Sequence, residues 1–120
     1  MLIAFWIVAG LAALVFLAAG LMKLARPAEA LQASGMAWVE DFSSGPVKLI
    51  GLAEVLGAIG LIVPVATGIV PILSPIAGVL LAVLMIGAVV THVRRSEPPV
   101  PIALVVLAAA AAVLGFIVIS

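Results

Sequence analysis

A single acidic residue lies deep inside an apolar stretch of the chain. Glu54 stands about nine residues into a run that extends from Pro46 to about Val65. In a helix, that spacing places the carboxyl group on the order of 12 Å from the end at which the run begins. A carboxylate at this depth of a membrane is costly, so it should face the protein interior and find a polar partner. Glu54 is therefore a candidate for ligand binding or proton exchange.

Two basic side chains could meet this carboxylate. Lys23 follows the first apolar run, and His92 lies near the end of the third. Helical side chains lean toward the N-terminus of their own helix. In antiparallel helices, Glu54 would thus lean toward the charged end of the bundle, and Lys23 and His92 would lean inward. We predict one polar pocket formed by the three residues. The alternatives are a purely structural Glu54 and interfacial anchors at Lys23 and His92.

Small residues accompany Glu54 at helical spacing. Gly51, Gly57 and Gly60 lie at multiples of three from it, so they share its flank of the helix. Glycines at such spacing allow two membrane helices to approach closely. We predict that these glycines serve helix packing.

The composition indicates a membrane protein. Apolar residues make up 68% of the 120 residues and charged residues 8%, whereas soluble domains contain about 45–50% and about 25%. The chain has no cysteine, which excludes disulfides and thiolate metal sites within it. Its one histidine excludes bis-histidine haem ligation unless a second subunit contributes. No metal site is expected. The net charge of zero argues against nucleic acid as a partner.

Four apolar runs predict an all-α fold, a four-helix transmembrane bundle in a single domain over residues 1–120. The spans are expected at about 2–22, 46–65, 75–93 and 100–119. Nothing basic precedes the first run, so we interpret it as a permanent helix and not as a cleaved signal peptide. Pro64, Pro71 and Pro75 are expected to mark helix ends, with an uncharged turn over 66–75.

The connector between the first two spans holds most of the charge. A short helix is predicted from Pro27 to about Ser34, with Gly35 ending it. We expect it to lie at the membrane interface, with Trp38 as an anchor.

The basic residues predict the orientation in the membrane. All five lie in or beside the first and third connectors, namely Lys23, Arg26, Lys48, Arg94 and Arg95. The positive-inside rule then predicts a multi-pass protein of the plasma (inner) membrane, with these connectors in the cytoplasm and both termini outside.

Three segments resemble the DoxX-like family of small four-helix membrane proteins, and the resemblance covers essentially the whole chain. The first is Ala19-Gly20-Leu21-Met22-Lys23-Leu24, similar to the family's GxxKL signature. The second, residues 51–61, is similar to its G-x-x-E-x-x-G-A-x-G-L segment, with Glu54 at the acidic position. The third is the end of the third span, where Ala88 leads into Thr91-His92-Val93-Arg94.

This resemblance implies a membrane subunit associated with redox complexes, although many family members have no known activity. It implies Lys23, Glu54 and His92 as the site, with quinone or a lipid headgroup as the ligand compatible with a cysteine-free chain. The sequence leaves open whether the chain is an enzyme.

Two other hypotheses remain open at this stage. A non-catalytic scaffold or assembly factor would dock other membrane or redox subunits, or a second copy, through the small-residue faces of the second and fourth spans. A small proton-coupled transporter would use the intramembrane Glu54. The transporter hypothesis is weakened because small multidrug exporters carry their glutamate in the first helix.

Overall fold

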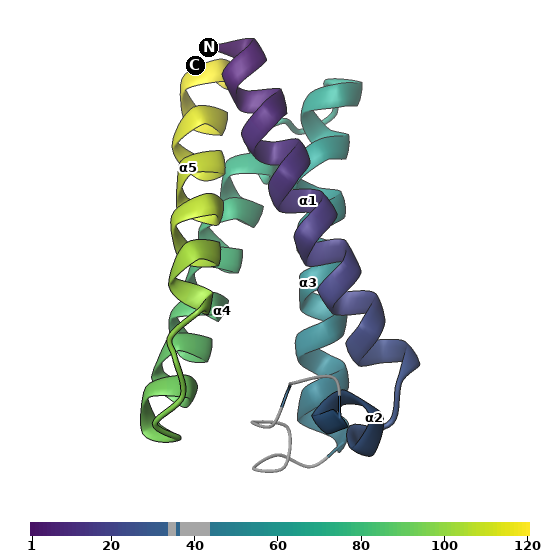
Figure 1. Ribbon diagram of the computed structural model, residues 1–120. Helices are drawn as coiled ribbons and strands as arrows, with labels where there is room; N and C mark the ends of the chain where they lie inside the picture. Colours follow the sequence, from purple (N-terminus) through teal and green to yellow (C-terminus); the bar gives the residue numbers. More distant parts are fainter. Residues whose placement is uncertain (34–35, 37–43) are drawn as a thin grey trace.

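In the computed structural model, the chain forms four long helices and one short helix (Figure 1). The structure describes residues 1–33, Met36 and 44–120, without the side chains at positions 28, 29, 32 and 44. The helices are α1 (Leu2–Ala25), α2 (Ala28–Ala33), α3 (Ser44–Thr67), α4 (Leu73–Arg94) and α5 (Pro101–Ile119). Within these residues there is no strand, so the chain is all-helical as predicted.

The four long helices are each long and apolar enough to cross a membrane. A 24-residue helix such as α1 is about 36 Å long, which exceeds the hydrocarbon thickness of about 30 Å. Large apolar side chains are exposed on every one of them, for example Leu14, Leu49, Leu80 and Val106. Exposure of so continuous an apolar surface is unfavourable in water but not in lipid. The chain is therefore a multi-pass membrane protein.

The long helices associate as two tight pairs. α1 packs most extensively against α3, and α4 against α5, while the contacts between the pairs, α3 with α4 and α1 with α5, are smaller. Figure 1 shows both termini at one end of the bundle, and α2 and the loop between α4 and α5 at the other end. We call the latter the connector end.

The core between the pairs combines two phenylalanines of α1 with many small residues. α1 contributes Phe5, Ala9, Ala12 and Phe16, which are fully buried and spaced so that they share one helix face. The other helices contribute mainly small or aliphatic residues to the same cluster, including alanines at 58, 77, 108 and 111. The two phenylalanines thus fill space that the small side chains leave between the helix pairs.

The turn between α3 and α4 is shorter than predicted. It is confined to residues 68–72, and Gly68 adopts a positive φ of 73° that suits a residue without a Cβ. Pro75 lies inside the first turn of α4. The N–H groups of the first turn have no partner within the helix, so a proline there loses no hydrogen bond, and the helix can begin before it.

The expectation that Pro64 marks a helix end is wrong, because α3 continues through it to Thr67. Proline there removes the hydrogen bond to the carbonyl of Gly60, one turn earlier, and its ring crowds that carbonyl. A membrane helix tolerates this when neighbouring groups compensate. Nearby, the buried hydroxyl of Ser74 in α4 donates to the carbonyl of Leu61 at 2.7 Å.

The connector after α1 begins later than expected. α1 extends to Ala25, so Lys23 belongs to its last turn. The short helix α2 follows Pro27 and ends at Ala33. The predicted end at Ser34 and Gly35, and the predicted anchor Trp38, lie outside the described residues.

Candidate functional site

An ion pair joins α1 and α3 inside the bundle. Nζ of Lys23 lies 2.6 Å from Oε1 of Glu54 and donates a hydrogen bond to it. Lys23 is 6% exposed and Glu54 1%. Charged groups of this kind are rarely so buried unless they are paired, because the loss of hydration must be offset by a close partner. The pair is therefore a polar centre enclosed in an apolar bundle.

Close approach of two helix backbones brings these side chains together. A Cβ added to Gly20 of α1 would lie 2.6 Å from the carbonyl oxygen of Gly51 in α3 and 2.7 Å from Cγ2 of Val55. A Cβ added to Gly51 would lie 2.8 Å from the Cβ of Lys23. Only glycine fits at both positions. The contact lies one turn from Lys23 on α1 and one turn from Glu54 on α3, so it sets the separation of the pair.

A second lysine holds the end of α1. Nζ of Lys48, in the first turns of α3, donates to three backbone carbonyl oxygens: those of Lys23 at 2.7 Å, Leu24 at 3.0 Å and Arg26 at 2.8 Å. Carbonyls at the C-terminus of a helix lack partners within the helix and carry partial negative charge, so an ammonium group satisfies them well. In the sequence, Lys48 indicates only the orientation in the membrane, because a cluster of backbone carbonyls has no sequence signature.

A cavity of about 540 Å³ adjoins the ion pair at the connector end. All four long helices contribute to its wall, so it lies between the two helix pairs. Lys23, Glu54 and His92 all line it, together with apolar and small residues that include Met85, Gly87, Ala88 and Leu104. A few polar groups in a mainly apolar cavity of this size are typical of sites for small molecules.

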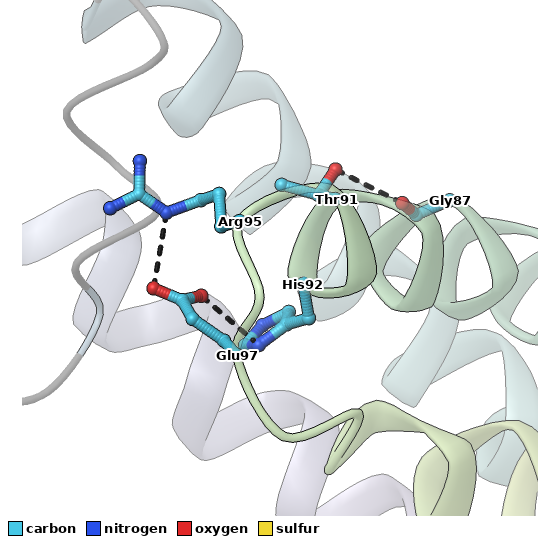
Figure 2. Close-up of polar contacts among 5 residues, drawn as sticks. All are labelled: Gly87, Thr91, His92, Arg95 and Glu97. Carbon is cyan, nitrogen blue, oxygen red and sulfur yellow. Dashed lines mark hydrogen bonds and ion pairs between the residues drawn. The ribbon is translucent and has the colours of Figure 1, made fainter.

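His92 lies at the wall of this cavity with its own acidic neighbour. Its Nδ1 is 3.3 Å from Oε1 of Glu97, although no aligned hydrogen bond reaches Nδ1 from the described residues. Oε2 of Glu97 accepts a hydrogen bond from Nε of Arg95 at 3.1 Å (Figure 2). His92 thus shares the cavity with the Lys23–Glu54 pair but is paired with the loop between α4 and α5.

The three predicted packing glycines contact two different helices. Gly51 faces α1, as described above. A Cβ on Gly57 would meet Cδ2 of Leu81 at 2.6 Å, and one on Gly60 would meet the Cβ of Ala77 at 3.1 Å, both in α4. The equally tight Gly20 was missed as a packing residue, although its place one turn before Lys23 was a usable signal.

Comparison with known proteins identifies one relationship. The model of the DoxX-like family matches residues 7–114, which is nearly the whole chain and includes every site residue named above. No curated protein and no solved structure matches the chain.

Proposed function

Since the chain belongs to the DoxX-like family, we propose that its cavity binds the polar head of a membrane-soluble ligand, with a quinone as the preferred candidate. The Lys23–Glu54 pair beside a cavity of about 540 Å³ is the observation that carries this proposal. A pair that served structure alone would gain nothing from an adjoining cavity of ligand size.

The charge balance of the site favours an uncharged head. Lys23 and Glu54 neutralise one another at 2.6 Å. A buried anion or cation added beside them would remain without a counter-charge, which is costly. A quinone ring is neutral and offers carbonyl oxygens that accept hydrogen bonds from an ammonium group, while the hydroxyls of a quinol donate to a carboxylate.

The same groups suit proton exchange with such a ring. Reduction of a quinone to a quinol takes up two electrons and two protons. The electrons would come from a partner redox subunit in the same membrane, and the protons would reach the ring oxygens through Glu54 and Lys23. His92 lines the cavity and contacts Glu97 in the loop at the connector end, so these two residues would connect the cavity with water.

The proposal includes an orientation. Residues 1–120 would form one transmembrane domain of the plasma (inner) membrane, with the connector end in the cytoplasm and both termini outside. The five basic residues support this, because all of them belong to the connector end. α2 would lie at the membrane interface.

The scaffold hypothesis has less support from the packing. The small residues of α3 and α5 that suggested a docking face are occupied within the bundle: Gly57 and Gly60 meet α4, and Ala112 and Gly115 meet Gly78 and Pro75 of α4.

Binding of a tail-less benzoquinone to the purified protein in detergent tests the proposal. By isothermal titration, Glu54→Gln should weaken binding about tenfold or more, because the substitution keeps the shape and removes the charge that holds Lys23 in place. Arg94→Gln is the control, since Arg94 is exposed at the same end and does not line the cavity. Equal affinity in the wild type and Glu54→Gln would refute the assignment.

A second variant tests the cavity itself. A Cβ added to Gly87 meets no atom within 4 Å, so a larger side chain can start there, and Gly87→Leu adds bulk to the wall of the cavity. The matched control is Gly10→Leu, where an added Cβ is equally free but lies outside the cavity. We expect lost binding only in Gly87→Leu.

A further inference from the structure

A second hollow lies between α3 and α4. Its volume is about 580 Å³, and only glycine, alanine, valine, leucine and isoleucine line it among the described residues. We call it the α3/α4 groove, defined by Leu56 and Gly60 of α3 and by Ile76, Leu80 and Leu84 of α4. Leu56 is 59% and Leu80 63% exposed, so the groove opens on the surface that faces lipid.

The groove adjoins the cavity at the ion pair. Leu84 lines both hollows. On α3, Ala53 of the groove directly precedes Glu54 of the cavity. The two hollows therefore lie side by side, with Leu84 at their boundary, and the polar groups belong to the cavity and not to the groove.

The cavity and the groove follow one another along the helix axes, and these axes cross the membrane. The cavity lies at the connector end, and along α4 the groove leads from the middle of the helix, at Leu84, toward the opposite end of the bundle. Along α4 it extends from Leu73 to Leu84, which is about 16 Å at the helical rise. A molecule with a polar head and a hydrocarbon tail takes this orientation in a membrane.

We propose that the α3/α4 groove holds the single hydrocarbon tail of the ligand whose head lies at Lys23 and Glu54, and that this ligand enters sideways from the membrane between α3 and α4. The inference rests on the proposed function and extends it, because it adds a long apolar tail to the ligand class and names its route. The place of the groove directly beside the polar cavity favours the tail of this ligand over a phospholipid chain or a helix of a second copy, which would cover the groove without needing the cavity.

The test compares the tail-less benzoquinone with its decyl-tailed counterpart on the purified protein. Leu80→Trp narrows the groove. The control Leu14→Trp makes the same change at an exposed residue of α1 that lines neither hollow. Leu80→Trp should weaken binding of the decyl quinone about tenfold and leave that of the tail-less quinone within about twofold, while Leu14→Trp changes neither. Each variant is compared with the wild type for the same ligand, so partition of the tail into detergent cancels.

The outcomes separate the two proposals. If Glu54→Gln weakens both quinones but Leu80→Trp affects neither, the tail assignment is wrong and the head site stands. If Glu54→Gln weakens neither, the head site is wrong and the tail assignment falls with it. Ile76→Trp, also in the groove, repeats the test should Leu80→Trp fail to fold.

A further variant distinguishes the other occupants. The chain has no cysteine, so Leu80→Cys introduces a single thiol into the groove. Both quinones carry fully substituted rings, so that neither adds the thiol covalently. Protection of this thiol from an alkylating reagent by the decyl quinone, and not by the tail-less quinone, is the expected result. Disulfide-linked dimers in native membranes would assign the groove to a second copy, and a thiol protected by phospholipid that decyl quinone cannot displace would assign it to the bilayer. Either result overturns the inference.

Discussion

The two helix pairs of this protein are held together by different means. α1 and α3 share a buried ion pair, a backbone contact at Gly20 and Gly51, and three hydrogen bonds from Lys48 to the end of α1. α4 and α5 have no ion pair between them, since α5 contains no charged residue. They rely on small residues instead: a Cβ on Gly78 would lie 2.9 Å from the Cβ of Ala112.

This difference indicates that the two helix pairs have different roles in the candidate site. The α1/α3 pair fixes the polar groups of the candidate site, and its geometry is specified by hydrogen bonds that have preferred directions. The α4/α5 pair supplies most of the apolar wall of the cavity, for which close packing is sufficient. Variants at the contacts between α1 and α3 should therefore change both stability and ligand binding, whereas variants at the packing contacts between α4 and α5, away from the cavity and the groove, should change stability alone.

The largest effect should follow from removing one partner of the ion pair. Lys23→Met leaves the Glu54 carboxyl group buried without its counter-charge, and we expect a loss of about 3–5 kcal/mol in the free energy of unfolding. The double variant Lys23→Met/Glu54→Gln should recover part of it, because no charge is left alone. Unfolding by SDS titration measures both. Arg94→Met is the control, with an expected change within about 0.5 kcal/mol. Additive losses in the double variant would show that the pair does not couple α1 to α3.

A methyl group at the glycine contact should have the next largest effect. Gly20→Ala forces the backbones of α1 and α3 apart, since its Cβ would lie 2.6 Å from a carbonyl oxygen, and overpacking of this kind costs about 1–3 kcal/mol. Gly78→Ala should cost a similar amount in the other pair. Thermal unfolding and quinone titration together distinguish them: we expect both variants to unfold earlier and only Gly20→Ala to lose affinity.

Gly10→Ala is the matched control, because its Cβ meets no atom within 4 Å. Alanine is also the better helix former, so this variant should be as stable as the wild type or more stable. A loss of affinity in Gly78→Ala equal to that in Gly20→Ala would contradict the division between the pairs.

The smallest effect should come from the lysine at the end of α1. Lys48→Met removes three donors from carbonyls that lie near solvent, and we expect a loss of about 1–2 kcal/mol. Hydrogen exchange should quicken at the last turn of α1, around Met22 to Arg26, and stay unchanged at the last turn of α4. Uniform faster exchange over both pairs would mean that Lys48 supports the whole bundle and not α1 alone.

The sequence by itself determined the class of the protein, its helices and the residues of interest. Apolar runs of membrane length reveal spans without any knowledge of packing, because the bilayer imposes that length on each helix separately. A charge within such a run is costly enough to mark Glu54 as functional or paired. The motif around Lys23 and Glu54 also identified the family to which the chain belongs.

Only the tertiary structure decided which helices pair and where ligand-sized space remains. Lipid is as apolar as leucine, so hydropathy does not tell which face of a membrane helix turns inward. Gly20 and Gly10 illustrate this: both are glycines of α1, yet one touches α3 and the other meets nothing. The pairing of Lys48 with three carbonyls, the cavity and the α3/α4 groove likewise depend on how backbones from distant parts of the chain are placed, and no local pattern of residues records that placement.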